Sequence, residues 1–310
     1  MSGGSPTPTP APAPTPVPTP GTARATALVL AGRRGPDDPV AVAAGLSHKC
    51  LVPAGGVPML ARVIAALAAS HSVARIAVSI ETPGLVADLA PSLPPAAAAG
   101  LVVVESRATP SLSALAAAEA LDRPFPLLIT TADHPLLTPD VVDSFLAAAH
   151  ATGADVAAGL VPAERVLAAH PDAKRTFLRF RDGRMSGCNL FCVRTATGLD
   201  VLRFWRRVER DRKRPWRIAT ALGPGTLLRY GLGRLTLAQA LERLSKVAGA
   251  DARAVVVPVA DAAIDVDKAD DLALVERILA HRERAAAGVV AADPSPPTEG
   301  CRAPPPSVLG

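Results

Sequence analysis

The stretch Thr26-Ala27-Leu28-Val29-Leu30-Ala31-Gly32 is an apolar strand that enters a loop rich in Arg, Gly, Asp and Pro, and this loop ends at His48-Lys49-Cys50-Leu51-Val52-Pro53. Gly55-Gly56-Val57-Pro58-Met59-Leu60 then leads into a helix. Glycines let backbone N–H groups approach phosphate oxygens, and cations neutralise the phosphate charge. This order of features therefore predicts a triphosphate-binding loop, although a plain surface connection in an Arg-rich chain is the alternative.

Lys49 is the first candidate in this loop because the chain uses arginine almost everywhere. The five lysines are Lys49, Lys174, Lys213, Lys246 and Lys268. The loop lacks the Gly-Lys-Ser/Thr of a Walker loop and the Gly-x-Gly-x-x-Gly of a dinucleotide fingerprint.

Strand-like and helix-like segments alternate along the first half of the chain. Strands are expected at 25–31, 74–80, 101–105, 126–130 and 154–161, and helices at 59–69, 111–121 and 139–150. This alternation predicts right-handed βαβ units and an α/β fold: a three-layer, Rossmann-like, mainly parallel (mixed) sheet with helices on both faces. Later elements are expected as strands at 176–180, 188–193 and 254–259, and as helices at 195–213, 215–223, 236–248 and 272–284.

Composition divides the chain into one large domain and two tails. Residues 1–23, rich in Pro, Thr and Ala, and the Pro-rich residues 285–310 cannot bury enough apolar surface to fold, so both are expected to be disordered. Residues 24–284 form the predicted domain, and 162–250 are expected to be an elaboration on the acceptor side of the sheet.

The remaining composition favours a cytoplasmic protein. There is no apolar run of about 18 to 20 residues that would span a bilayer, and the N-terminus lacks a signal-peptide layout. Four cysteines suit a reducing compartment, and Cys188 and Cys192 are interpreted as small buried residues. The net charge of +5 suits a nucleotide-binding enzyme, and no aromatic pattern for nucleic acid accompanies it.

Two acidic motifs follow predicted strands. In Thr130-Thr131-Ala132-Asp133-His134-Pro135, a strand ends in a carboxylate at the edge where open α/β sheets bind ligands, so Asp133 could hold Mg²⁺ against phosphates. In Ile264-Asp265-Val266-Asp267, alternation places Asp265 and Asp267 on one face, and one of them could supply the second carboxylate. Capping of a turn or helix is the alternative for Asp133 and for Asp267.

Taken together, Leu-Ala-Gly, the Gly/Arg loop, Lys-x-Leu-x-Pro, Gly-x-Pro-Met-Leu, Asp-x-Pro-Leu and Ile-Asp-Val-Asp-x-x-x-Asp-Leu resemble the nucleotidyltransferases with a glycosyltransferase-A-like fold. The chain is similar to their molybdenum-cofactor guanylyltransferase-like (MobA-like NTP transferase) branch over about 25–160 and 250–280. One departure is Arg33, which replaces the second glycine of the usual Leu-Ala-Gly-Gly.

The resemblance implies roles for particular residues. The implied nucleotide contacts are Leu30, Ala31, Gly32, Arg33, Arg34, Lys49 and Ser111, with Lys49 and Arg34 as the catalytic cations on the triphosphate. Asp133 and Asp267, or Asp265, would hold Mg²⁺. On the acceptor side, Gly187, Asn189 and Arg175 would meet the substrate. For Ser111 the alternative is an N-cap, for Gly187 a β-bulge, and for Arg175 a solvated strand face.

The implied activity is Mg²⁺-dependent transfer of an NMP from an NTP, with CTP or GTP favoured, to a small sugar, polyol or cofactor phosphate, with release of pyrophosphate. The attacking phosphate is already an anion, so no general base is needed, and His48 and His134 are interpreted as local hydrogen-bonding residues. Two alternatives are a catalytically silent nucleotide- or phosphate-binding protein of the same fold, and a peripheral membrane-binding protein that uses the basic segment 203–217. The identity of the NTP and the acceptor, and the oligomeric state, are left open.

Overall fold

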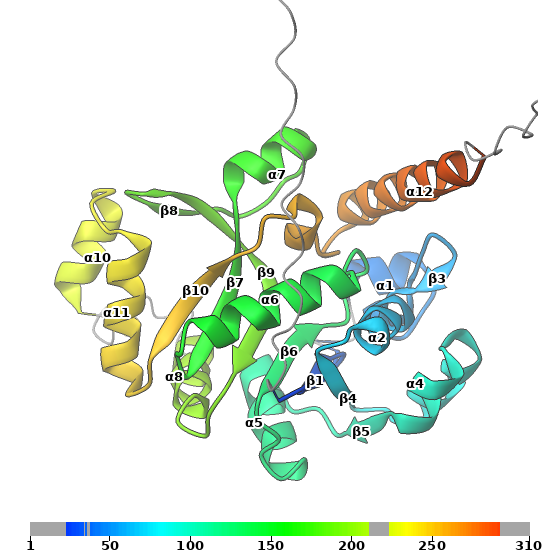
Figure 1. Ribbon diagram of the computed structural model, residues 1–310, viewed down its shortest axis with the longest axis horizontal. Helices are drawn as coiled ribbons and strands as arrows, with labels where there is room; N and C mark the ends of the chain where they lie inside the picture. Colours follow the sequence, from blue (N-terminus) through cyan, green and yellow to red (C-terminus); the bar gives the residue numbers. More distant parts are fainter. Residues whose placement is uncertain (1–22, 34, 36–37, 211–222, 292–310) are drawn as a thin grey trace, which may run out of the picture.

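The computed structural model describes residues 23–33, 35, 38–210 and 223–291. Within them, an eight-stranded sheet has the order β10-β7-β9-β6-β1-β4-β5, and β8 pairs with β9 (Figure 1). Its strands are β1 (Ala25–Leu30), β4 (Val73–Ser79), β5 (Val102–Val104), β6 (Leu127–Thr131), β7 (Val156–Pro162), β8 (Leu178–Phe180), β9 (Gly183–Val193) and β10 (Ala252–Val256). β1, β4, β5 and β6 are mutually parallel, as are β7 and β10, whereas β9 is antiparallel to β6 and β7. This confirms the predicted mixed, mainly parallel sheet.

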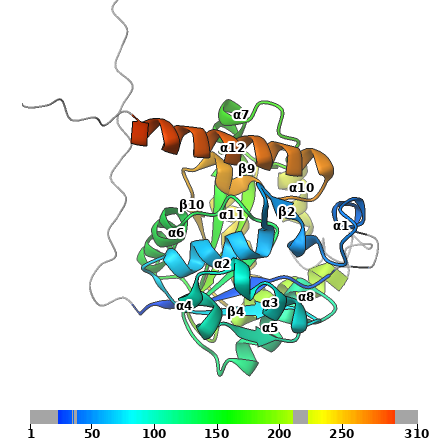
Figure 2. The same cartoon turned by 90° about the vertical axis from the view of Figure 1, so that its right-hand side faces the viewer.

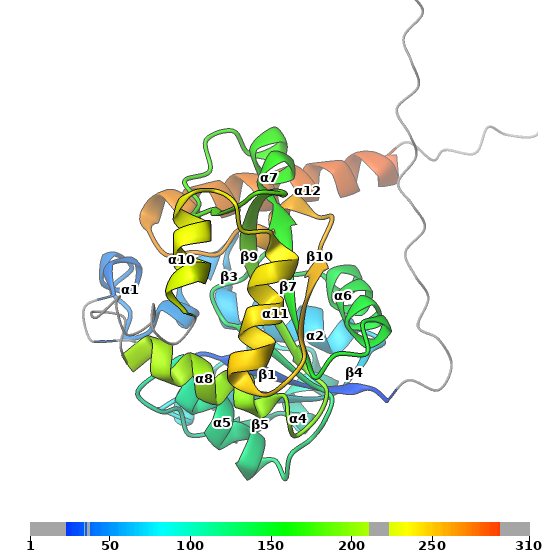
Figure 3. The same cartoon turned by 90° about the vertical axis from the view of Figure 1, so that its left-hand side faces the viewer.

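Helices cover both faces of the sheet, which makes three layers (Figure 3). One face carries α2 (Met59–Ala69) and α6 (Pro139–Ala151), and the other carries α5 (Pro110–Ala120), α8 (Leu199–Arg210) and α11 (Leu237–Ala248). Shorter elements are α1 (Pro39–Ala43), the 3₁₀ turn η1 (Lys49–Leu51), the β2–β3 hairpin (Pro53–Ala54 and Val57–Pro58), α3 (Gly84–Asp88), η2 (Ala90–Ser92), α4 (Pro95–Gly100), α7 (Ala163–Ala169), α10 (Pro224–Gly231) and η3 (Ala260–Ala263). The last helix, α12 (Ala269–Ala291), runs along the top of the domain above α2 (Figure 2).

The central strand β1 shows why an unbroken apolar run folds as a buried parallel strand. Leu28 and Val29 are both fully buried, but they belong to different core clusters, one on each face of the sheet. A strand with helices on both faces needs apolar side chains at every position rather than at alternate ones. Because β1 is parallel to both β4 and β6, the carboxyl ends of these three strands lie side by side, and the loops that follow them share one edge of the sheet.

Local sequence signals set the helix starts near this edge. Thr109 and Thr138 are the N-caps of α5 and α6, each accepting a hydrogen bond from the backbone N–H three residues on, with a proline as the first helical residue. Gly55 and Gly56, with φ of 55° and 74°, form the tight turn of the β2–β3 hairpin that feeds α2.

Some expectations need correction. The strand expected at 188–193 begins earlier, at Gly183, because it forms a hairpin with β8. The last helix does not end near residue 284 but continues to Ala291, and the three alanines at 285–287 favour this continuation. Two further expectations lie almost wholly outside the described residues. Of the expected tails, only residues 23 and 285–291 are described, and of the helix expected at 215–223, only its last residue is. Across the described part, no helix is long and apolar enough to cross a membrane.

Candidate active site

Lys49, Asp133 and Asp267 converge from three distant segments at the edge of the sheet. Lys49 begins η1, Asp133 follows β6, and Asp267 precedes α12. The ammonium of Lys49 donates to Asp133 Oδ2 at 2.6 Å and to Asp267 Oδ1 at 3.1 Å. Burial lowers the pKa of Lys49, but the two carboxylates outweigh that effect and hold the pKa above its ordinary value. This arrangement brings both acidic motifs to the lysine at the end of the loop after β1.

The two acidic turns are also joined through the backbone. The N–H of Val266 donates to the carbonyl of Asp133 at 2.9 Å, which ties the segment before α12 to the end of β6. Other residues cap the two helices that follow these turns. Thr138 caps α6, and Asp271 accepts from the backbone N–H groups of residues 267 and 268 at the start of α12.

Asp265 has different partners from Asp267. Its side chain pairs with the Arg175 guanidinium and accepts a 2.7 Å hydrogen bond from Asn189 Nδ2. Burial raises the pKa of Asp265 above its ordinary range, although Arg175 opposes the shift. Of the two candidate carboxylates, therefore, Asp267 shares a cation with Asp133, and Asp265 holds Arg175 and Asn189 in place.

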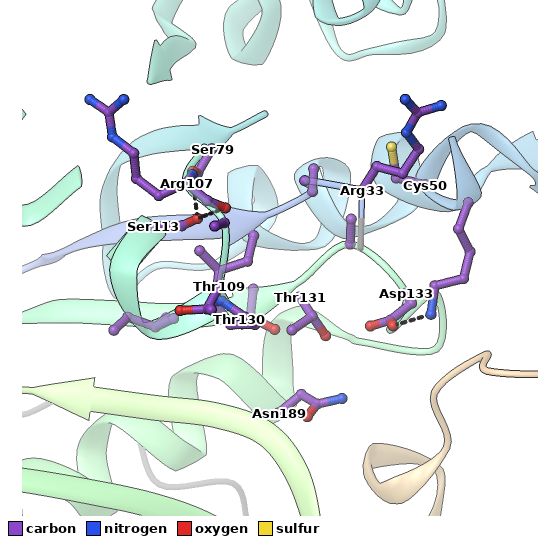
Figure 4. A pocket seen from close by; sticks show the side chains of 18 of the residues that line it. Arg33, Cys50, Ser79, Arg107, Thr109, Ser113, Thr130, Thr131, Asp133 and Asn189 are labelled. Carbon is purple, nitrogen blue, oxygen red and sulfur yellow. Dashed lines mark hydrogen bonds and ion pairs between the residues drawn. The ribbon is translucent and has the colours of Figure 1, made fainter. Parts of the chain in front are cut away.

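A cavity of about 520 Å³ extends from Lys49 along the edge of the sheet (Figure 4). Its lining comes from the loop after β1, the ends of β4 and β6, the loop before α5, and side chains of β9 and α8. Among the candidate site residues, those that line it are Leu30, Ala31, Gly32, Arg33, Lys49, Asp133, Asp267 and Asn189. Gly187 and Arg175 are not among the lining residues, and Arg34 lies outside the described residues.

The alternative role of Ser111 as an N-cap is wrong. Thr109, not Ser111, is the N-cap of α5. The buried Ser111 hydroxyl donates to the Glu209 carboxylate on α8, and so it ties the two helices together beside the cavity. Ser113 instead accepts from the Arg107 N–H at 2.8 Å and closes the loop before α5.

Glu81 anchors the loop after β1, and the sequence motifs did not include it. It follows β4 and accepts hydrogen bonds from the Arg33 backbone N–H at 3.1 Å, from His48 Nε2 at 3.0 Å and from Ser106 Oγ at 3.1 Å. Partial burial raises the pKa of Glu81, but these hydrogen bonds lower it more, so the carboxylate is held ionised. Its position after a strand next to β1 is the signal that could have identified it.

A glycine is needed at position 32 because the Ser106 side chain, which donates to Glu81, lies very close to its backbone. A Cβ at this position would lie 2.9 Å from both Cβ and Oγ of Ser106, which is closer than side-chain carbons come in real structures. His48 is confirmed as a local hydrogen-bonding residue between Ser47 and Glu81. His134 is fully buried, and burial lowers its pKa to about 4.

Three further residues that line the cavity were not predicted as site residues. They are Phe191 on β9 and Trp205 and Glu209 on α8. Trp205 was assigned to the basic segment at 203–217, and its side chain is half-exposed. Helix α8 reaches the site only because it packs on α5, which places residues distant in sequence side by side.

The donor set at Lys49 suits a hard divalent cation that is completed by substrate. Asp133 and Asp267 converge on one positively charged group, the position a shared metal would take. In the described residues no group of three or more His, Cys, Asp or Glu side chains could hold a metal. Mg²⁺ is commonly bound by one or two carboxylates, with waters and substrate phosphates filling the remaining positions, so the residues present fit it.

Comparison with known proteins identifies the family. The model of the MobA-like NTP transferase domain matches residues 27–195. A hypothetical transferase from Thermus thermophilus is 33% identical, with a TM-score of 0.67, and the alignment covers 80% of this chain and 99% of that one. A search of curated proteins finds no match.

Two less similar structures share the fold. A CMP:2-keto-3-deoxy-manno-octonic acid synthetase complexed with CTP is 16% identical, with a TM-score of 0.52 and coverage of 84% of this chain and 100% of that one. A 4-diphosphocytidyl-2C-methyl-D-erythritol synthase from Anaerococcus prevotii is 10% identical, with a TM-score of 0.51 and coverage of 83% and 99%. The sheet, the motif order and the matched family model lead to one conclusion: the chain is a transferase that belongs to the MobA-like NTP transferase family.

Proposed function

We propose that this transferase moves an NMP from an NTP, with CTP or GTP favoured, to a small sugar, polyol or cofactor phosphate in a Mg²⁺-dependent reaction that releases pyrophosphate. The observation that carries the proposal is the convergence of Lys49, Asp133 and Asp267 on the wall of a cavity of about 520 Å³. That volume lies within the range of pockets that enclose small ligands.

The proposed role of each residue follows from the charge and hydrogen-bonding groups of its side chain or backbone. Lys49 is the cation for the triphosphate, and backbone groups of Ala31 and Gly32 meet the nucleotide, with Leu30 and Arg33 beside them. Arg34 is proposed to add a second cation. Asp133 and Asp267 are proposed to hold Mg²⁺, which, when bound, neutralises charge on the phosphates.

In this reaction the protein contributes mainly by positioning the two substrates and by stabilising negative charge on the phosphates. An oxygen of the acceptor phosphate attacks the α-phosphorus, the bond to the β-phosphate oxygen breaks, and pyrophosphate leaves. The nucleophile is already ionised, so no side chain has to remove a proton. Lys49 stabilises the negative charge that develops on the departing pyrophosphate.

The acceptor side is proposed to centre on Asn189, which lines the cavity. Asn189 has a φ of 53°, a left-handed conformation that fixes where its side chain points. Its amide donates to Asp265, which Arg175 holds in turn. Arg175 and Gly187 therefore shape the acceptor side through Asn189 and its strand, and Ser111 shapes the nucleotide side through Glu209.

The test is pyrophosphate release from each of the four NTPs with a panel of sugar, polyol and cofactor phosphates. Lys49→Ala and Asp133→Asn should reduce the rate at least 100-fold, while Lys246→Ala should leave it unchanged. Lys246 is a matched control because it pairs with Glu242 on the exposed surface of α11. If the wild-type protein shows neither turnover nor Mg²⁺-dependent nucleotide binding, the proposal is wrong.

The two alternative functions are weaker. A silent nucleotide-binding protein would not need two carboxylates directed at one cation, and the family is one of transferases. The membrane-binding segment 203–217 lies partly outside the described residues, so that idea stays a prediction. Salt-sensitive liposome binding that survives Lys49→Ala would support it.

A further inference from the structure

The Lys49 ammonium occupies the position between the two carboxylates that a divalent cation would need. It contacts Asp133 Oδ2 at 2.6 Å and Asp267 Oδ1 at 3.1 Å, and the Lys49 side chain is only 17% exposed. A metal that bound the same oxygens would have to displace the ammonium or lie directly beside it. Like charges at such short range repel, so the cation and the metal compete for one place.

We propose that the Lys49 ammonium is an internal counter-ion that blocks metal binding to Asp133 and Asp267 in the nucleotide-free protein. When a triphosphate binds, Lys49 moves to the phosphates and frees the two carboxylates. Metal and nucleotide therefore bind tightly together, and each binds weakly without the other. The inference rests on the proposed function in one respect, since the triphosphate is the group that draws Lys49 away. The carboxylates then become available to the metal that accompanies the phosphates.

The surroundings of the three groups allow this exchange. The Asp133 side chain is 10% exposed, whereas that of Asp267 is 52% exposed, so the ion pair is buried on one side and open on the other. Lys49 also lines the cavity, into which its side chain can turn. Because half of the Asp267 side chain is exposed, water competes with Lys49 for its carboxylate, and breaking this contact costs little free energy.

The choice of lysine over arginine supports the same interpretation. The chain carries 33 basic residues, of which only five are lysines, yet a lysine stands here. Arginine presents several donors on a rigid plane, and Arg175 nearby uses two of them for a fixed contact, one on the Asp265 carboxylate and one on the Asp265 backbone carbonyl. Lysine is a point charge on a flexible stem, which can move from one anion to another.

The first test measures metal binding without nucleotide, using Mn²⁺ as a paramagnetic probe in titrations followed by electron paramagnetic resonance. Lys49→Met keeps the apolar stem and removes the charge, so it should bind Mn²⁺ at least ten-fold more tightly than the wild-type protein. Lys246→Met, which breaks a surface pair at 2.6 Å, should bind as the wild type does. Adding Asp267→Asn to Lys49→Met should abolish the gain. Unchanged or weaker Mn²⁺ binding by Lys49→Met would overturn the inference.

The second test measures coupling. With a non-hydrolysable NTP analogue, the factor by which nucleotide tightens Mn²⁺ binding equals the factor by which Mn²⁺ tightens nucleotide binding. We expect this factor to be at least ten-fold smaller in Lys49→Met than in wild type, and an equal factor in both proteins would contradict the inference. If Lys49→Met fails to fold, Lys49→Arg replaces it and should bind Mn²⁺ more weakly than wild type in the presence of the analogue; equal or tighter binding would count against the inference.

The outcomes separate this inference from the proposed function. Absence of pyrophosphate release from every NTP defeats the proposed function but leaves the metal affinity of Lys49→Met interpretable. Conversely, pyrophosphate release by the wild-type protein, together with a metal affinity that is unchanged in Lys49→Met, defeats the counter-ion inference alone.

Discussion

Replacing Asp265 with asparagine should destabilise the fold far more than the same change at Asp267. The Asp265 and Arg175 side chains are only 16% and 12% exposed, so the change leaves a largely buried guanidinium without its charge partner. Breaking a buried ion pair by removing one partner costs about 3 to 5 kcal/mol. Asparagine keeps the size of the side chain and can still accept from Asn189, so the loss reports mainly on charge.

The matched change, Asp267→Asn, breaks a contact with Lys49 in which the Asp267 side chain is 52% exposed. Exposed ion pairs contribute about 0 to 1 kcal/mol. For a domain of this size, about 1 kcal/mol shifts the melting temperature by about 2 to 4 °C. The melting temperature should therefore fall by roughly 6 to 20 °C for Asp265→Asn and by about 4 °C or less for Asp267→Asn.

The assay is thermal and urea unfolding of the metal-free, nucleotide-free protein, followed by nucleotide-dependent Mn²⁺ binding of each folded variant. Asp267→Asn should lose Mn²⁺ binding, and Asp265→Asn should keep it in proportion to the folded fraction. The reasoning is refuted if Asp267→Asn is the more destabilised variant, or if metal binding is lost only with Asp265→Asn.

Three other predictions concern stability and the loop after β1. Asp143 accepts from Ser70 Oγ at 2.6 Å and from the backbone N–H groups of residues 71 and 72, and these hydrogen bonds hold its pKa below the ordinary value despite the opposing effect of burial. Because its pKa is lower in the folded than in the unfolded protein, Asp143 stabilises the fold above about pH 4, and this stabilisation is lost as the pH falls through the folded-state pKa. In urea titrations, the difference in unfolding free energy between the wild type and Asp143→Asn should therefore shrink at acid pH, and a constant difference would contradict this. Gly32→Ala should weaken nucleotide binding at least ten-fold, while Gly35→Ala, where a Cβ meets nothing within 4 Å, should not; equal calorimetric affinities would disprove the steric argument. Gly159→Ala places a Cβ 2.5 Å from Cys188 Sγ and should cost about 1 to 3 kcal/mol, which Cys188→Ala should partly restore in a double-mutant cycle.

Much of the fold could be predicted from the sequence because the parallel core leaves strong local signals. The helix at Met59–Ala69 has the predicted bounds, and β1 ends one residue before the prediction. The short elements between 84 and 100 were not predicted, because pieces of three to six residues carry too little periodicity. Helix α7 was missed for the same reason.

The site was predicted in part. Lys49, Asp133 and the acidic pair before α12 were singled out from their positions after strands, and the structure brings them together. Glu81 and Trp205 were missed, since neither belongs to a recognisable motif. Each reaches the site through the packing of its own element, β4 against β1 and α8 against α5.

The α/β class, the order of the motifs and the choice of Lys49 as the first candidate could all be inferred from the amino-acid sequence. These follow from local apolar runs, turn residues and the carboxyl ends of parallel strands, all of which are read along the chain. The different partners of Asp265 and Asp267 could not be inferred in this way, because alternation puts both side chains on one face and does not indicate which cation each will contact. Those partners depend on β9, which brings Asn189 to Asp265, and on the segment between α7 and β8, which brings Arg175 there and leaves Asp267 to share Lys49 with Asp133.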